Sequence, residues 1–174
     1  MVYPPARTTD DDLGEPVRPF KMGLAAPGPR SGATVRLGAD RVYHAASTMK
    51  TPVMLEVLRR VDAGTLKLTD EIPVVNEFRS ALDGSAFKVE IEHESDDPTV
   101  AKLGGKATLG FLVKEMIVRS SNFATNLVLT HLGAGSVQAF LDRIGAGTVK
   151  VRRGVDDLKS FEANYAKHKA EYEQ

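Results

Sequence analysis

The chain has 174 residues, of which 42% are hydrophobic and 26% are charged, values typical of a soluble globular protein with a real core. Its 23 basic and 23 acidic side chains cancel to a formal net charge of +0, so neither nucleic acid nor an anionic membrane surface is an expected partner. The absence of cysteine excludes disulfides, thiolate catalysis and cysteine-ligated zinc.

The N-terminal residues lack the apolar stretch of a secretory signal peptide, and no later run is long enough to span a bilayer. The compartment stays open, because the chain as written is either cytoplasmic or without its leader. Residues 1–19 are rich in proline and contain the acidic run Asp10-Asp11-Asp12, which favours an irregular tail. We expect residues 20–174 to form a single domain.

The first regular elements are predicted to be two strands. Residues 20–26 are compatible with a strand, and the glycines and prolines of residues 27–32 predict a turn. Residues 33–37 alternate between apolar and polar side chains, so we expect them to pair with the first strand in a hairpin.

A helix that carries chemistry is predicted to begin near Ser47. Ser47 and Lys50 are three residues apart and share a helix face, so their side chains can come within hydrogen-bond distance. A serine hydroxyl becomes a good nucleophile when a base takes its proton, and a partly buried lysine with a lowered pKa can be that base. The unpaired N–H groups and the positive dipole end of a helix start favour negative charge beside the nucleophile. An apolar stripe continues the helix, and Gly64 predicts its end.

The S-x-x-K pattern is weak evidence by itself, because Ser85-Ala86-Phe87-Lys88 is a second copy. Residues 89–92 alternate like a strand, which would direct Ser85 and Lys88 to opposite faces. The helical context therefore favours Ser47, and an ordinary surface serine is the alternative.

The middle of the chain gives weaker signals. Residues 66–75 predict a short crossing segment, and residues 76–84 are compatible with a helix. Residues 90–98 predict an acidic loop that contains His93. One histidine among carboxylates without regular ligand spacing indicates a charged surface rather than a metal site. We therefore predict no metal and no other cofactor.

Three helices are predicted after residue 107. Thr108 is suited to cap the first, whose apolar residues share one face. The second follows a break at Ser120-Ser121-Asn122. Ser136 is expected to cap the third, which stops at Gly145. Residues 152–157 then predict a loop.

The break between the first two of these helices carries two polar groups. The hydroxyl of Ser120 and the carboxamide of Asn122 are two residues apart and can face one cleft, as a proton shuttle and an amide hook. The alternative is that Ser120 or Ser121 only caps the helix that follows.

Together, Ser47–Lys50 and Ser120-Ser121-Asn122 resemble the class A β-lactamase and penicillin-binding family, whose signature is S-x-x-K, S-D-N and K-T-G. The similarity extends to residues 58–64 and 116–127 and covers about Met22 to Phe161 in the expected order. It implies an α+β fold of the α/β sandwich type, similar to β-lactamases and D,D-peptidases, with mainly the helical domain and an N-terminal β-hairpin present.

The resemblance also implies a role for each site residue. Ser47 would be the acylating nucleophile, with half of the oxyanion hole formed by its backbone N–H, and Lys50 would accept its proton. Ser120 would pass a proton to the leaving nitrogen, and Asn122 would hold Lys50 and the side-chain amide of the substrate. Asp156 would be the equivalent of the glutamate that activates the deacylating water in class A enzymes. Aspartate is one methylene shorter, and a misplacement of about 1 Å can slow a reaction on the order of 10²-fold, so we expect faster acylation than turnover.

The sequence departs from the family pattern at several points. Ser121 stands where the signature has an aspartate, and the string closest to K-T-G, Lys159-Ser160-Phe161, lacks the glycine. The N-terminal helix of the family is not evident, and too few residues follow Asn122 for its remaining helices and strands. We therefore expect the N-terminal part of such an enzyme with the late sheet strands missing. The open edge of the hairpin predicts low stability or association with another chain.

Three functions are compatible with these features. The first is hydrolysis of a small-molecule β-lactam through an acyl-Ser47 intermediate. The second is a D,D-peptidase or esterase with the same acylation half, and the third is a catalytically silent, truncated relative. A Ser–His–Asp triad is a weaker interpretation, because no Gly-flanked serine elbow accompanies any histidine: His44, His93, His131 or His168.

Overall fold

The computed structural model describes residues 24–27, 34–37, 45–91, 97–151, 153–157, 159, 162–163 and 166. The expected hairpin is present as β1 (Leu24–Pro27) and β2 (Thr34–Leu37), which pair antiparallel with Leu24 opposite Leu37. Residues 20–23 and 28–33 lie outside the described residues. The hairpin belongs to a different unit from Ala45–Lys169, so each is described by itself. The division into a tail of residues 1–19 and a domain of residues 20–174 stays a prediction.

The helix expected at Ser47 is confirmed as α1 (Lys50–Asp62), which follows a 3-10 turn, η1 (Ala46–Met49). Its inward stripe includes Val53 and Val57, both fully buried. Pro52 is tolerated because it is the third residue of α1, where a backbone N–H has no partner within the helix. The helix ends before Gly64, whose φ of +70° suits glycine.

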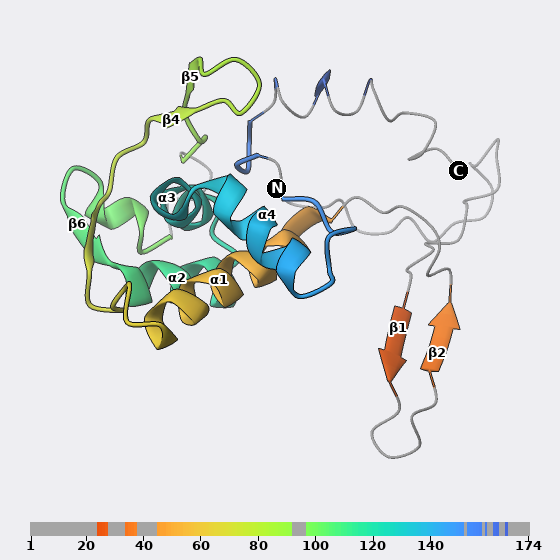
Figure 1. Ribbon diagram of the computed structural model, residues 1–174. Helices are drawn as coiled ribbons and strands as arrows, with labels where there is room; N and C mark the ends of the chain where they lie inside the picture. The colour runs from red at the N-terminus through yellow and green to blue at the C-terminus, as the bar shows by residue number, and fades with distance from the viewer. Residues whose placement is uncertain are drawn as a thin grey trace, which may run out of the picture. The chain divides into compact units, whose positions relative to one another are not determined.

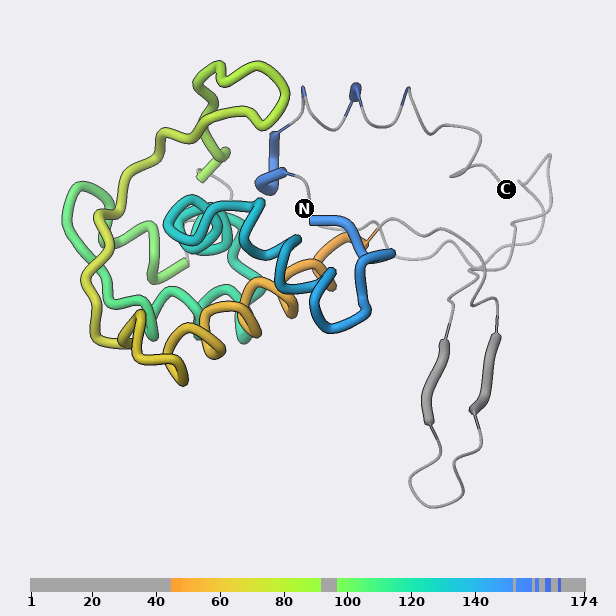
Figure 2. Tube along the Cα trace, viewed as in Figure 1, coloured from red at the N-terminus to blue at the C-terminus, as the bar shows by residue number. Residues whose placement is uncertain are grey.

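The segment between α1 and α2 contains short strands (Figure 1), and Figure 2 traces its path. β3 (Glu71–Pro73) pairs antiparallel with β6 (Lys106–Thr108), and β4 (Phe78–Arg79) pairs antiparallel with β5 (Ala86–Phe87). The helical interpretation of residues 76–84 is wrong, because they form one side and the turn of the β4–β5 hairpin. Residues 89–91 do not form the expected strand, residue 92 lies outside the described residues, and the strand in this part of the chain is β5. A short 3-10 turn, η3 (Val100–Lys102), precedes β6.

Three helices follow: α2 (Leu109–Val118), α3 (Asn122–Leu132) and α4 (Ala134–Arg143). The predicted cap of α2 is confirmed, because Thr108 Oγ1 accepts from the N–H of Phe111 at 3.2 Å. The predicted cap of α4 is wrong. Gly133, with φ +79°, separates α3 from α4 and is the N-cap residue of α4, which therefore has no side-chain cap. Ser136 donates instead to the carbonyl of Leu132.

The four helices pack around one core (Figure 1), with α1 in contact with α2, α3 and α4. Because α3 is buried on most of its surface, its apolar residues lie at the centre of this packing. The largest fully buried apolar side chains are Phe123, Leu109, Leu112, Met116, Val53, Val57, Val74, Val128 and Val137.

The described residues therefore have the expected α+β character. They are rich in helix, and their three sheets have two strands each. Within this part of the chain, no helix combines the length and the apolar character that crossing a bilayer requires.

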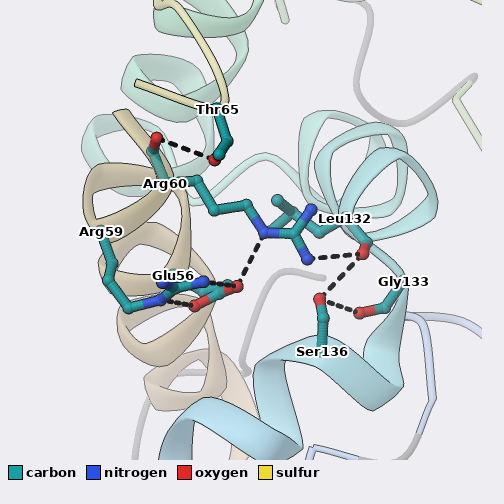
Figure 3. Close-up of polar contacts among 7 residues, drawn as sticks. All are labelled: Glu56, Arg59, Arg60, Thr65, Leu132, Gly133 and Ser136. Atoms are coloured by element: carbon teal, nitrogen blue, oxygen red, sulfur yellow. Dashed lines mark hydrogen bonds and ion pairs between the residues drawn. The ribbon is translucent and has the colours of Figure 1, made fainter. Parts of the chain in front are cut away.

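A buried carboxylate ties α1 to the junction of α3 and α4 (Figure 3). Glu56 accepts two hydrogen bonds from Arg59, at 2.7 and 2.9 Å, and one from Arg60 at 2.7 Å. Arg60 also donates to the carbonyl of Leu132 at 3.4 Å, and Ser136 donates to the same carbonyl at 2.8 Å. The hydrogen bond from Arg59 contributes most to lowering the pKa of Glu56, burial acts in the opposite direction, and the bond from Arg60 adds to the lowering.

Candidate functional site

Ser47 lies in η1, one turn before Lys50, and its side chain is exposed. The backbone N–H of Lys50 bonds to the carbonyl of Ser47, so the 3-10 turn runs directly into α1. The tight turn sets the serine at the helix start while the lysine enters the interior, where its side chain is 3% exposed. The local sequence thus places an accessible hydroxyl beside a buried amine.

Lys50 is surrounded by oxygen atoms from the break between α2 and α3. Its Nζ donates to Ser120 Oγ and to Asn122 Oδ1, both at 3.0 Å, and to the carbonyl of Ser120. Ser120 Oγ in turn donates to Ser47 Oγ at 3.1 Å. A continuous run of hydrogen bonds therefore links Ser47 to Lys50 through Ser120. The structure brings together four of the five residues that the sequence singled out.

The break between the helices contains both a helix cap and side chains that contact Lys50. Ser121 caps α3, because its Oγ accepts from the N–H of Ala124 at 3.0 Å. Ser120 does not cap the helix and turns its hydroxyl toward Lys50 from a left-handed backbone with φ +57°. Ser121 therefore forms the cap, and the Ser120 hydroxyl bonds to Lys50 and Ser47 instead.

Asp156 lies on the loop of residues 153–157, also in a left-handed conformation, with φ +62°. Burial raises the pKa of its carboxyl above the ordinary aspartate value, and the negative charge of Glu90 acts in the same direction. The cations of Lys50 and Arg153 oppose this rise. The charge of Lys50 thus acts on the Asp156 carboxyl, whereas the other four predicted residues are joined by direct hydrogen bonds.

The loop that carries Asp156 is fastened to α3 by Asn126. The Asn126 side chain accepts from the N–H of Val155 and donates to its carbonyl, each at 2.7 Å. Gly154 allows this approach, because a Cβ there would lie 2.6 Å from Asn126 Oδ1. No local pattern predicts this contact, since an asparagine on an apolar helix face has many possible partners.

Asp157 fastens the same loop on its other side. It is 1% exposed and accepts from Ser80 Oγ at 2.8 Å and from the N–H of Ala81 at 2.9 Å, both in the β4–β5 turn. Lys159 adds a bond to Ser85 Oγ at 3.0 Å. The hydroxyl of the second S-x-x-K serine is therefore bonded to Lys159.

The acidic loop contains a further residue whose environment differs from the predicted one. Asp97 was expected on a charged surface, but it is 9% exposed and accepts a hydrogen bond from Ser121. His93 lies outside the described residues. Among the residues that are described, no three histidine or carboxylate side chains gather in a way that could hold a metal ion.

Comparisons with known proteins identify relatives of this chain. A model of the beta-lactamase enzyme family (Beta-lactamase2) matches residues 16–172. A beta-lactamase of Rhodobacter capsulatus is 31% identical over 123 residues, which are 70% of this chain and 38% of that protein.

Two solved structures show the same fold. An ancestral (GNCA) class A beta-lactamase has a TM-score of 0.60 at 26% identity, covering 78% of this chain and 48% of that one. PBP-A, as a mutant in an acyl-enzyme complex with penicillin G, has a TM-score of 0.53 at 26% identity, covering 71% of this chain and 42% of that one. The chain spans less than half the length of each of these three relatives. Because the family model matches most of the chain and both structures share its fold, the chain belongs to the beta-lactamase enzyme family.

Proposed function

We propose that the chain carries the acylation machinery of a serine hydrolase that opens the amide bond of a β-lactam and transfers the acyl group to Ser47. The observation that carries this proposal is the run of hydrogen bonds from Ser47 Oγ through Ser120 Oγ to Lys50 Nζ, at 3.1 and 3.0 Å. A nucleophile linked in this way to an amine has a route along which its proton can leave. Membership of the family supports the same reaction class.

In the acylation step, Ser47 Oγ attacks the carbonyl carbon of the substrate and forms a C–O bond. Its proton moves through Ser120 to Lys50, which must be neutral at the moment of attack. When the C–N bond breaks, the proton returns through Ser120 to the leaving nitrogen, and an ester on Ser47 results. The Oδ1 of Asn122 holds Lys50 in place, and its amide nitrogen can donate to the side-chain amide of the substrate.

Asp156 is the proposed base for hydrolysis of this ester. A raised pKa makes its carboxylate a stronger base than an ordinary aspartate, which favours removal of a proton from water. Its side chain is short for a residue that must reach a water beside the ester, and a deficit of about 1 Å can cost on the order of 10²-fold in rate. We therefore expect the acyl-enzyme to form faster than it is hydrolysed.

A D,D-peptidase or esterase with the same acylation half is the second candidate function. The likeness to PBP-A, whose mutant forms an acyl-enzyme with penicillin G, favours it. Because the chain spans less than half of its relatives, a catalytically silent relative is the third outcome of the same experiment.

The test is the intact mass of the protein after incubation with benzylpenicillin. We expect the wild-type mass to increase by that of one penicillin and the Ser47→Ala variant to stay unchanged. Ser85→Ala removes the serine of the second S-x-x-K pattern and is the matched control, which should be acylated like the wild type. A chromogenic β-lactam then separates turnover from a stable adduct. A folded wild type with neither an adduct nor turnover, or an adduct on Ser47→Ala, would overturn the proposal.

A further inference from the structure

A buried carboxylate lies behind the turn that carries Ser120 and Asn122. Asp97 precedes η3 and comes from a part of the chain far from α3 in sequence. One carboxylate oxygen accepts from the hydroxyl of Ser121, and the other accepts from the N–H of Thr99 at 2.7 Å. At 9% exposure, this carboxylate has little access to solvent and depends on these protein donors. The reaction scheme proposed above gives Asp97 no task.

The contact fixes residue 121 at several points. The Ser121 hydroxyl donates to Asp97 and accepts from the N–H of Ala124, so its rotamer is determined from both sides. The backbone N–H of Ser121 donates to the carbonyl of Glu115 at 3.2 Å. A left-handed residue such as Ser120 persists when its surroundings restrain it, and these bonds restrain the residue next to it.

Ser120 and Asn122, the two neighbours of Ser121, are the residues that hold Lys50. We propose that Asp97 is a positioning residue for acylation, which acts through Ser121 to aim the Ser120 hydroxyl and the Asn122 amide at Lys50. This inference rests on the proposed function. It also accounts for the departure at Ser121, because the carboxylate that the S-D-N signature carries on the turn is supplied here from residue 97, and the turn supplies the hydroxyl.

If the two positions have exchanged roles, exchanging them back restores the contact. In the double variant Asp97→Ser with Ser121→Asp, an aspartate caps α3 and accepts from the serine at position 97, which can still accept from the N–H of Thr99. Ser121→Asp alone places two carboxylates in contact, and Asp97→Ala leaves the Ser121 hydroxyl without its acceptor.

The experiment measures the rate of penicillin acylation by intact mass, across a range of pH and below the melting temperature of every variant. We expect each single variant to acylate roughly 10- to 100-fold more slowly, as expected for a displaced proton route, and the double variant to recover most of this loss. Asp83→Ala is the matched control, because Asp83 accepts from the N–H two residues ahead as Asp97 does, but in the β4–β5 turn. It should leave the rate and its pH profile unchanged.

If Asp97→Ala does not fold, the milder Asp97→Asn takes its place. A lowered melting temperature with a wild-type rate and pH profile would make Asp97 purely structural and overturn the inference, as would a double variant no faster than the slower single one.

If the wild type shows neither an adduct nor turnover, the proposed function fails separately. In that case the NMR chemical shift of Lys50 ¹³Cε tests the inference. We expect this chemical shift to change in the Asp97 variant and not in Asp83→Ala. An unchanged chemical shift in the Asp97 variant would overturn the inference.

Discussion

Two residues of the candidate site occupy the left-handed region of backbone conformation. Ser120 has φ +57° and Asp156 has φ +62°, and such a backbone costs an L-residue roughly 1–2 kcal/mol. Each is restrained by its neighbours: Ser121 caps α3, and both Val155 and Asp157 are bonded to other elements. The chain therefore keeps these two residues in a costly backbone conformation by fixing the residues beside them, and Ser120 is thereby held against Lys50.

Asp156 should lower the stability of the folded chain near neutral pH. Its pKa is raised, chiefly by burial, so the stability that it contributes is present below the ordinary aspartate pKa and is lost as the pH rises through the folded value. Asp156→Asn should therefore raise the melting temperature near neutral pH, and the gain should vanish in acid. Thermal melting of both proteins over this range measures the effect.

Asp83→Asn is a control for which the expected change in melting temperature has the opposite sign. Hydrogen bonding from Ser85 lowers the pKa of Asp83, so this carboxylate contributes stability above its ordinary pKa and loses it in acid. Its replacement should lower the melting temperature slightly near neutral pH. A drop for Asp156→Asn under the same conditions would contradict the burial-dominated environment assigned to Asp156.

At the scale of elements, the C-terminal half of α1 is joined to the end of α3 by the Glu56 cluster (Figure 3). Glu56 is 1% exposed at its side chain, whereas Arg59 and Arg60 are 38% and 25% exposed. The arginines can therefore return to solvent when the carboxylate is removed, which limits the cost of breaking the cluster. α1 also carries Lys50, so this cluster orients the helix that holds the amine of the site.

Glu56→Gln should lower the free energy of unfolding by about 2 kcal/mol, because hydrogen bonds to charged groups contribute roughly 1.5–3 kcal/mol. The pKa of Glu56 is lowered, so this stability is present above the ordinary glutamate pKa and is lost as the pH falls through the folded value. Denaturant unfolding near neutral pH and in acid should show the gap between the two proteins closing.

The matched control is Glu71→Gln, which breaks the surface pair between Glu71 and Lys106 on the β3–β6 sheet. Both side chains are more than 60% exposed, and such pairs contribute about 0–1 kcal/mol. Equal losses for Glu56→Gln and Glu71→Gln would mean that the buried cluster is no stronger than a surface pair.

At the scale of the whole molecule, local patterns predicted the elements and their order but not the contacts between them. The apolar periodicity of α1, α2 and α3 and the cap at Thr108 are encoded within a few residues, so they could be read directly. The β4–β5 turn was missed because each of its strands has two residues, too few for an alternating pattern. The cap of α4 was missed because Ser136 bonds backward to the preceding helix.

In the candidate site, too, local patterns predicted the residues but not the contacts between them. The S-x-x-K spacing predicted Ser47 and Lys50 as site residues, and the polar break between two helices predicted Ser120 and Asn122. Their convergence, and the supports from Asp97, Asn126 and Asp157, join segments far apart in the sequence, and no short-range pattern encodes such pairs.

The chain is expected to associate with itself. Each sheet in the described residues has two strands, and Val118 and Leu82 are 72% and 58% exposed. Two-stranded sheets are marginally stable in water, and their edges present unpaired backbone groups. Sedimentation velocity over a concentration series should show oligomers that grow with concentration. A monomer throughout, with one cooperative melting transition, would contradict this expectation.

Val118→Lys separates two causes of association. The variant adds a charge to the exposed end of α2, so it should weaken association that depends on this apolar surface. Association through sheet edges should not respond to it.

The fit between Gly154 and Asn126 limits how sequences of this kind can diverge. A methyl group at position 154 would meet an amide oxygen 2.6 Å away that is itself engaged by the N–H of Val155. The two positions are therefore free to vary only as a pair, and the glycine should persist in any descendant that keeps the asparagine. A descendant with a smaller residue at 126 would gain freedom in the loop and lose the two hydrogen bonds that fasten Val155, the neighbour of Asp156, to α3.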